Sequence, residues 1–387
     1  MSEAPQLRWS EGGREHEARW RSEAGVPVPR RVQVVDDTLK ADAAWRLASE
    51  GTALLWRSDF QNARQLMQAM GRRADRKPRR AAAPAASPAG RPVPAQAFHL
   101  HRQAQGQRSR ILGSLLIPLD ADYGIPLPRA PDIRQACREA WGEPDGQPSV
   151  ASLRELLGLV GAHEWRKKGV EVPALGVPPA NRIHAHYGVF SPVRGEYIDL
   201  VAAAPLPSTA LAFDIGTGTG VLAALLARRG VQRVVATDQD PRALACAREN
   251  VTRLGLRDRV EVMQADLFPP GRAPLIVCNP PWLPARPSSP LEYAIYDEDS
   301  QMLRRFLEGL AAHLDAGGEG WLILSDLAEH LGLRAPGELQ GWISSAGLRV
   351  LGRSDVRPRH PKAGDPGDPL HAARAREVTS LWRLALA

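Results

Sequence analysis

The chain has 387 residues, enough for two domains of about 100–200 residues each. Its formal net charge of +7 is compatible with an anionic partner such as RNA but does not require one. No stretch approaches the ~20 apolar residues of a membrane span, and the N-terminus is too polar for a secretion signal. The three cysteines are too far apart to suggest a zinc site or a disulfide framework, so we expect a cytoplasmic protein with reduced thiols.

The first part of the chain predicts a small, mostly helical region without a catalytic motif. Residues 1–30 are polar and are expected to form a loosely ordered tail. Residues 36–56 predict a helix, a turn at Gly51 and a short strand, and residues 59–73 predict an amphipathic helix closed by Gly71. Further helices are expected at the start of residues 98–120, at 130–142 and at 149–169.

Residues 72–96 consist mainly of Arg, Ala and Pro. Such a segment cannot bury enough apolar surface to offset the entropy of ordering, so it predicts a disordered linker. Its basic run, residues 72–80, is compatible with phosphate contact and also with a simple solvated charge run. We place the boundary between the two domains at about residue 180.

From residue 180 onward, strands alternate with helices, which argues for a mostly parallel sheet with helices on both faces. The five strands are expected at residues 210–216, 232–238, 259–266, 274–279 and 320–326. The helices are expected at residues 220–230, 240–256 and 300–314. Two last strands, 347–356 and 378–386, have no clear helix between them and predict an antiparallel edge pair.

The sequence "DIGTGTG" is a glycine-rich turn between the first of these strands and its helix. Gly216, Gly218 and Gly220, with Thr217 among them, allow a tight turn and a close approach of the backbone to a ligand. Dehydrogenases that bind dinucleotides have similar loops. Asp214 precedes the first glycine, which disfavours a pyrophosphate there and favours a cationic amino-acid group.

Two further acids follow the second and third strands. Asp238 lies about twenty residues beyond the loop and can accept both hydroxyls of a ribose. Its alternative role is a helix cap, but Asp240 fits that role well. Asp266 can accept the exocyclic amine of an adenine, and Leu267 or Phe268 can pack against the ring.

This arrangement over residues 180–387 is similar to the class I S-adenosylmethionine-dependent methyltransferases. "NPPW" at 279–282 resembles the Asn-Pro-Pro-aromatic signature of enzymes that methylate a planar nitrogen. "HYGVFSPVRGEY" at 186–197 resembles the GVF-x-P segment of HemK-type glutamine methyltransferases, whose pattern continues Arg-Pro-Glu-Thr-Glu and uses NPPY. The resemblance implies a seven-stranded Rossmann-like fold, S-adenosylmethionine as cofactor, and cover of that cofactor by Phe190 and Pro192.

The chemistry of such a transfer explains the residue types after the fourth strand. An NH2 nitrogen on a planar group is a poor nucleophile because its lone pair is delocalised. The Asn279 side-chain oxygen and the Pro280 carbonyl can each accept one N–H, and Pro281 stiffens the turn. Trp282 can stack on a flat acceptor, worth ~1–3 kcal/mol for a nucleobase. The alternative is a turn with one buried tryptophan, and no metal is required.

Two acceptors fit: an exocyclic base amine in RNA or DNA, or a glutamine side chain in a translation protein. Residues 1–180 would help to select the target. An NAD(P)-linked oxidoreductase would use the glycine loop but has no role for NPPW, and a non-catalytic binding module is the third reading. His184 and His186 lack further metal ligands and favour structural or substrate-contact roles. Acids at 297–299 predict helix capping, and the basic loop 357–376 is compatible with RNA contact or mobility.

Overall fold

The computed structural model describes residues 4–75, 94–288, 290–359 and 365–387. The chain forms two compact units, one of Met1–Arg91 with His99–Glu164 and the other of Pro92–Phe98 with Trp165–Ala387. The boundary therefore lies near residue 165 and not at 180. Arg166, at the end of a long helix, belongs to the C-terminal unit and donates a 2.6 Å hydrogen bond to Glu249 of the same unit.

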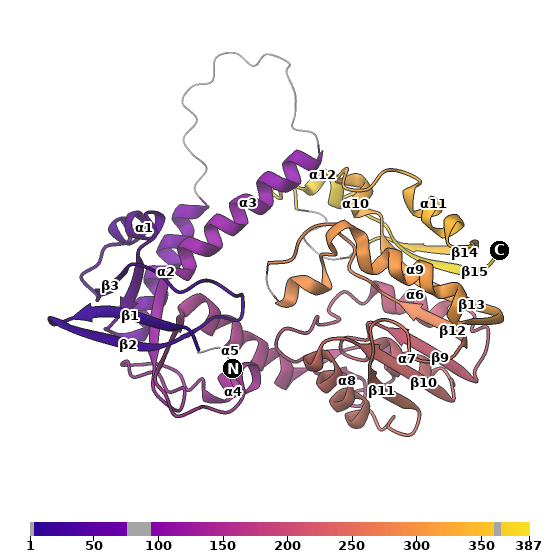
Figure 1. The fold of residues 1–387 in the computed structure, drawn as a ribbon, viewed down its shortest axis with the longest axis horizontal. Helices are drawn as coiled ribbons and strands as arrows, with labels where there is room; N and C mark the ends of the chain where they lie inside the picture. Colours follow the sequence, from indigo (N-terminus) through magenta and orange to yellow (C-terminus); the bar gives the residue numbers. More distant parts are fainter. Residues whose placement is uncertain (1–3, 76–93, 289, 360–364) are drawn as a thin grey trace, which may run out of the picture. The chain divides into compact units, whose positions relative to one another are not determined.

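The N-terminal unit is built on a six-stranded sheet in the order β1-β2-β6-β5-β4-β3, drawn from indigo to magenta in Figure 1. Its strands are β1 (Gln6–Glu11), β2 (Arg14–Arg21), β3 (Val32–Val35), β4 (Ala53–Trp56), β5 (Leu115–Leu119) and β6 (Ser149–Ser152). Its helices are α1 (Ala41–Ser49), α2 (Phe60–Ala74), α3 (Pro94–Gly113), α4 (Arg134–Trp141) and α5 (Leu153–Lys168), of which α3 and α5 also extend into the other unit.

The prediction of a mostly helical N-terminal region was wrong in omitting this sheet. The expected loose tail is the β1–β2 hairpin, in which Leu7, Trp9, Ala18 and Trp20 pack on one core. Their period-two spacing is the strand signal within a polar sequence. Every residue of β5 and β6 is buried, so the sequences of these strands show no alternation of apolar and polar residues. Their residues were therefore included in the segments predicted to contain the neighbouring helices.

The predicted ends of the linker also differ from the structure. Gly71 lies inside α2, which continues to Ala74, so it does not close that helix. At the other end α3 begins at Pro94. Residues 76–93, the centre of the predicted linker and most of its basic run, lie outside the described residues.

The C-terminal unit contains a seven-stranded sheet in the order β11-β10-β9-β12-β13-β15-β14. The strands are β9 (Leu211–Ile215), β10 (Arg233–Asp238), β11 (Val260–Gln264), β12 (Ala273–Cys278), β13 (Leu314–Ser325), β14 (Leu348–Val356) and β15 (Thr379–Leu386). β15 is antiparallel to both of its neighbours, while β9 to β13 pair in parallel. The predicted seven-stranded, mostly parallel fold with an antiparallel last strand is confirmed.

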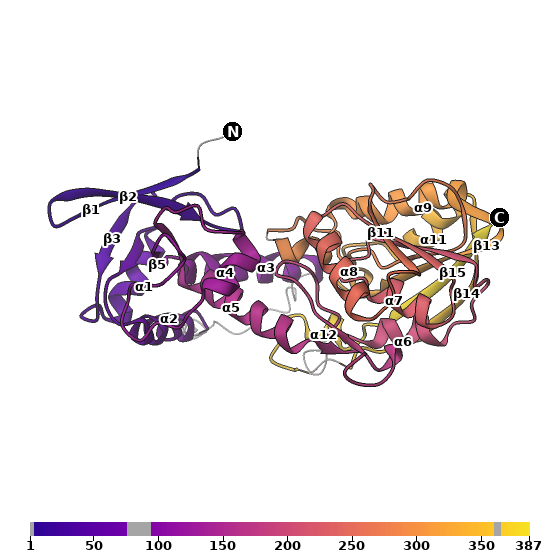
Figure 2. The same cartoon turned by 90° about the horizontal axis from the view of Figure 1, so that it is seen from below.

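Helices cover both faces of this sheet, as Figure 2 shows. One core contains α6 (Glu196–Ala203), α7 (Val221–Arg228) and α8 (Pro241–Arg253); the other contains α9 (Gln301–His313) and α11 (Glu338–Ser345). The short elements are β7 (Val170–Glu171), β8 (Arg182–Ile183), α10 (Leu327–His330), α12 (His371–Arg374) and the 3-10 turns η1 (Pro173–Leu175), η2 (Pro290–Ala294) and η3 (Glu298–Ser300). Among the described residues no helix is long and apolar enough to cross a membrane.

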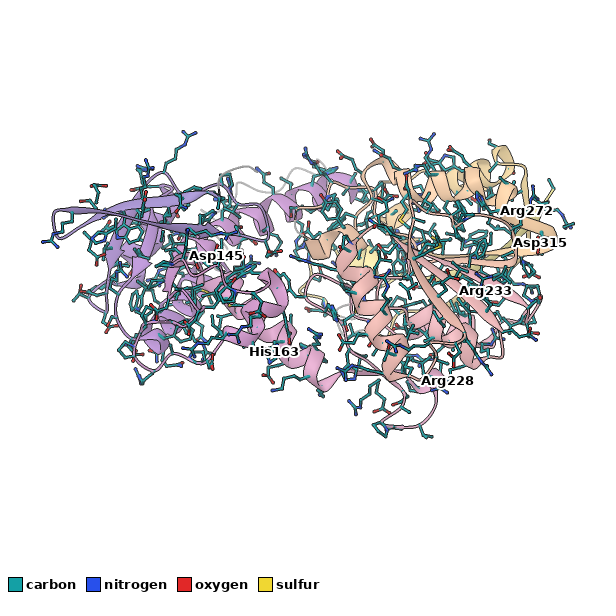
Figure 3. All side chains as sticks on the ribbon, turned by 60° about the horizontal axis from the view of Figure 1, so that its bottom comes forward. Asp145, His163, Arg228, Arg233, Arg272 and Asp315 are labelled. Atoms are coloured by element: carbon teal, nitrogen blue, oxygen red, sulfur yellow. The ribbon has the colours of Figure 1, made fainter. Side chains whose placement is uncertain are left out.

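The strand order reverses direction at β9, which has β10 on one side and β12 on the other. In open sheets of this kind a crevice forms outside the carboxyl ends of the strands at such a switch point. Arg233, Arg272 and Asp315 lie at or beside the amino ends of β10, β12 and β13, and Figure 3 shows them at one end of the sheet. The crevice is therefore expected at the opposite end.

Candidate active site

Three of the predicted site residues directly follow paired residues of neighbouring strands. Ile215 of β9 lies opposite Thr237 of β10 on one side and Cys278 of β12 on the other. Gly216, Asp238 and Asn279 are the next residues of these strands. The structure therefore brings the glycine loop, the second acid and the Asn-Pro-Pro-Trp turn to one edge of the sheet.

The glycine loop has the backbone conformation that its sequence predicts. Gly216, Gly218 and Gly220 have φ values of 70°, 55° and 80°, in the left-handed region that other residues rarely adopt. A Cβ on Gly216 would lie 2.8 Å from Cε of Met302, so this glycine is also needed for packing. A Cβ on Gly218 would meet nothing within 4 Å. Gly216 is thus packed against a neighbouring side chain, whereas the space beside Gly218 is free of atoms of the described residues.

Asp214 is buried beneath this loop, with 1% of its surface exposed. Its Oδ2 accepts hydrogen bonds from Thr217 Oγ1 at 2.6 Å and from the Ala223 amide at 3.0 Å. Burial raises the pKa of Asp214 to about 6. The carboxyl group therefore ties the loop to the first turn of α7, and its predicted contact with a cationic group stays a prediction, as does a ligand contact of Thr217.

Asp238 contacts the glycine loop from the next strand. Its Oδ2 accepts the Gly218 amide at 3.0 Å, and its Oδ1 accepts the Asp240 amide at 3.0 Å. Burial raises the pKa of this carboxyl group. Asp240 caps α8 by accepting the Arg242 amide at 2.8 Å, as predicted, which leaves Asp238 at the crevice. Each Asp238 oxygen retains a lone pair for a ribose hydroxyl.

The third acid lies two residues beyond the end of β11. Asp266 is exposed and forms an ion pair with Arg305, with N–O distances of 2.6 and 3.2 Å, and it also contacts Gln239. Leu267 is buried and has a positive φ of 71°. Phe268 stacks on Phe306 and His313 in the core beside α9, so Leu267 is the better candidate for packing against an adenine.

In the Asn-Pro-Pro-Trp turn, Trp282 Nε1 donates a 2.9 Å hydrogen bond to Asn279 Oδ1. An indole N–H can only donate, so the side-chain atom facing it must be the oxygen of Asn279. The amide orientation is therefore fixed by the tryptophan. The Trp282 ring is half-buried and packs beside both cores of the unit, so part of it serves packing. Pro280 is buried and Pro281 is half-buried.

The segment that precedes α6 is held against α8. His184 Nδ1 lies 2.6 Å from the Arg166 carbonyl oxygen, whereas His186 Nε2 lies 2.7 Å from Glu249 Oε2. The two histidines thus have separate partners, and the described residues contain no cluster suited to a metal ion. Both contacts fit the structural interpretation, and a role in substrate contact stays a prediction. Phe190 lies two residues before the buried Pro192, and its predicted contact with the cofactor stays a prediction.

Two residues of this edge were missed from the sequence: Met302, which touches the glycine loop, and Arg334, which touches the Trp282 carbonyl oxygen. Neither belongs to a motif, and each reaches the site only through the fold. Asp297 caps α9 as predicted, since its carboxylate accepts the Met302 and Leu303 amides at 3.1 and 3.2 Å. Of the basic loop 357–376, residues 360–364 lie outside the described residues, and the rest includes α12.

The fold and this edge define a class I methyltransferase. The sequence model of the methyltransferase small domain family matches residues 180–333. The chain is 31% identical over 179 residues to a tRNA1(Val) (adenine(37)-N6)-methyltransferase of Vibrio parahaemolyticus, covering 44% of this chain and 72% of that protein. The chain belongs to the methyltransferase small domain family, which confirms the predicted family and its cofactor, S-adenosylmethionine, and disfavours the oxidoreductase alternative.

The relatives are named for more than one acceptor. A release factor glutamine methyltransferase of Cereibacter sphaeroides is 33% identical over 183 residues, which are 43% of this chain and 63% of that protein. A tRNA1(Val) (adenine(37)-N6)-methyltransferase of Bacteroides thetaiotaomicron is 33% identical over 126 residues, 30% of this chain and 53% of that protein. The chain thus spans less than two thirds of both. A solved methyltransferase from Pyrococcus furiosus aligns at a TM-score of 0.40 and 18% identity, covering 58% of this chain and 96% of that chain.

Proposed function

We propose that the C-terminal unit transfers a methyl group from S-adenosylmethionine to the NH2 nitrogen of a planar acceptor. The observation that carries this proposal is the alignment of Gly216, Asp238 and Asn279 at the ends of three neighbouring strands. The first two supply a ligand-approach loop and a ribose acceptor, and the third supplies an amide for the acceptor nitrogen. An oxidoreductase would have no use for this third group.

The residues present fit the cofactor. Gly218 lies at the open part of the loop, Asp238 offers two carboxylate oxygens, and Leu267 offers a buried apolar surface near the end of the third strand. S-adenosylmethionine supplies an electrophilic methyl group when it is bound. Asp238 would hold its ribose and Leu267 would pack against its adenine, while the carboxylate of Asp266 would accept the adenine amine.

The acceptor nitrogen would be held by the Asn-Pro-Pro-Trp turn. One lone pair of Asn279 Oδ1 is used by Trp282 Nε1, which leaves the second for an N–H of the acceptor. The Pro280 carbonyl oxygen accepts the other N–H. Both bonds draw the hydrogens to one side and direct the nitrogen lone pair toward the methyl carbon. The transfer would balance with the C–S electron pair kept by sulfur and one N–H proton lost from the acceptor nitrogen to solvent. Such positioning can supply much of the rate enhancement.

The acceptor itself belongs to an RNA, a DNA or a translation protein in this proposal. An exocyclic base amine and a glutamine amide present the same planar NH2 group, and this chain has relatives named for each. We place the N-terminal unit in target selection and the protein in the cytoplasm. The formal net charge of +7 supports contact with nucleic acid.

The decisive experiment measures transfer of a tritiated methyl group from S-adenosylmethionine to cell extract. Parallel samples are treated with RNase, DNase or protease before counting, and the Asn279→Ala variant serves as the control. We expect label in one nuclease-sensitive or protease-sensitive fraction and none above background with the variant. Label that persists with Asn279→Ala would contradict the assigned role of this residue.

Calorimetric titrations separate this function from the two other classes. The methyltransferase binds S-adenosylmethionine and not NADH, the oxidoreductase binds NADH, and a non-catalytic module binds the methyl donor without transferring label to any fraction. Absence of S-adenosylmethionine binding by the intact chain would overturn the proposal.

A further inference from the structure

A buried arginine lies directly behind the Asn-Pro-Pro-Trp turn. Arg334 follows α10 and exposes only 4% of its surface. Its Nη2 donates a 3.2 Å hydrogen bond to Ser300 Oγ and lies 3.5 Å from the Trp282 carbonyl oxygen. Its guanidinium also lies over the Trp342 ring, 5.6 Å from the ring centroid. Arg334 therefore joins the Asn-Pro-Pro-Trp turn (residues 279–282, here called the acceptor turn) to Ser300, the residue that precedes α9.

Burying the Arg334 guanidinium lowers the stability of the fold. Among the described residues, Nε and Nη1 have no hydrogen-bond partner, and burial lowers the pKa of the group. The acids Asp297, Glu329 and Glu338 act on it only through longer-range attraction. A buried charge with two unsatisfied donors destabilises the fold, so we expect its position to have another use.

The segment that Arg334 contacts has an unusual backbone. Asp299 and Ser300 both have left-handed conformations, with φ values of 56° and 53°, although neither is glycine. Each such residue costs about 1–2 kcal/mol, so surrounding contacts must hold the turn in place. Asp297 holds it from the side of α9 by accepting two amides, and Arg334 holds it from the side of the Asn-Pro-Pro-Trp turn.

This strained turn determines where Met302 lies. Met302 is in the first turn of α9, and its Cε lies 2.8 Å from the position of a Cβ on Gly216. Any shift of the turn would therefore move a side chain that packs on the glycine loop. A short path of contacts runs from Trp282 through Arg334 and Ser300 to Met302 and the loop.

We propose that Arg334 is a positioning residue that holds the acceptor turn and the cofactor loop at a fixed separation by joining the Trp282 carbonyl to the Ser300 hydroxyl. This inference rests on the proposed function. Both contacts come from one nitrogen, Nη2, and the flat guanidinium lies over the Trp342 ring. A lysine would supply the charge but not this flat group, so its flexible side chain should hold the donor in place less firmly. A purely structural arginine would contribute to stability alone.

The test uses the full chain labelled with 5-fluorotryptophan and observed by 19F NMR. The Trp282 resonance is identified by its loss in Trp282→Phe. In Arg334→Met we expect this resonance to shift or split, while those of Trp20 and Trp56 in the N-terminal unit stay in place. We expect the Kd for S-adenosylmethionine to rise by about tenfold, within the range of networked residues that do not touch the ligand. Arg334→Lys should recover part of both effects, and Ser300→Ala should reproduce part of them.

Arg229→Met is the matched control. Arg229 is also partly buried and donates to the backbone carbonyls of Val201 and Ala204, but it follows α7 at the other end of the unit. The Arg229→Met variant should have a lower midpoint of thermal unfolding than the wild type, while its Trp282 resonance should stay in place. An unchanged resonance and an unchanged Kd in Arg334→Met, Arg334→Lys and Ser300→Ala would overturn the inference. If the wild-type chain binds no S-adenosylmethionine, the proposed function fails, whereas the NMR comparison still decides whether Arg334 positions Trp282.

Discussion

The two halves of the sheet edge are built in different ways. The proposed cofactor half, which comprises Asp214, the loop 216–220 and Asp238, is held by hydrogen bonds between residues at most 20 apart in sequence. The proposed acceptor half, which comprises residues 279–283, the start of α9 and Arg334, is held by contacts between residues up to 52 apart in sequence. The first half carries its geometry in a local motif, whereas the second depends on how several loops pack together.

Among the predictions, substitution of Trp282 is expected to have the largest effect, a loss of methyl-transfer activity. Trp282→Ala removes both the ring and the indole donor to Asn279, and we expect methyl transfer to fall by about 100-fold. Trp282→Phe keeps a flat ring but loses the donor, and we expect about a tenfold loss. Tritium transfer to the labelled fraction measures both. Equal rates for the Phe variant and the wild type would show that the indole bond does not orient Asn279.

Asp214 gives a pH-dependent test of the cofactor half. Its folded pKa of about 6 lies above the value of about 4 usual for an unfolded aspartate. Between these values the folded state binds more protons than the unfolded state, so stability falls as pH rises through this window and the cost is complete above it. Asp214→Asn keeps an oxygen acceptor for Thr217 and the Ala223 amide but does not titrate.

The variant should therefore gain stability relative to the wild type as pH rises from 4.5 to 7, by about 2 kcal/mol. Thermal unfolding midpoints at several pH values measure this difference. A difference that stays constant across the window would mean that Asp214 is ionised throughout and that its burial is compensated by contacts other than those seen.

The same contrast explains what sequence could and could not predict. Three strands of the C-terminal unit are recognisable in the sequence as continuous apolar runs. The glycine loop, Asp238 and the Asn-Pro-Pro-Trp turn lie at the carboxyl ends of these strands, so a parallel sheet predicts that they lie close together. Arg334 and Met302 have ordinary neighbours in sequence, and only the packing of α9 and the segment after α10 brings them to the edge. In the N-terminal unit, the fully buried β5 and β6 carry no alternation, so their sheet was hidden beside the helices that adjoin them.

A smaller effect distinguishes the two neighbouring acids after β10. Asp238→Ala should raise the Kd for S-adenosylmethionine by about tenfold, because a ribose acceptor and a bond to the Gly218 amide are lost together. Asp240→Ala removes the cap of α8 and should lower stability by about 1 kcal/mol with little change in that Kd. Calorimetry and thermal unfolding on both variants provide the measurements. The reverse pattern would assign the ribose to Asp240.

The smallest expected effect concerns the exposed ion pair between Asp266 and Arg305. Arg305→Ala should cost less than about 1 kcal/mol of stability, as should breaking the similarly exposed pair of Arg233 and Glu261 with Arg233→Ala. Only the first pair lies beside the proposed adenine site. If Asp266 accepts the adenine amine, Arg305→Ala should change the Kd for S-adenosylmethionine severalfold, whereas Arg233→Ala should leave it unaltered. An identical Kd in both variants would make Asp266 a surface residue and confine cofactor recognition in this half to the glycine loop, Asp238 and Leu267.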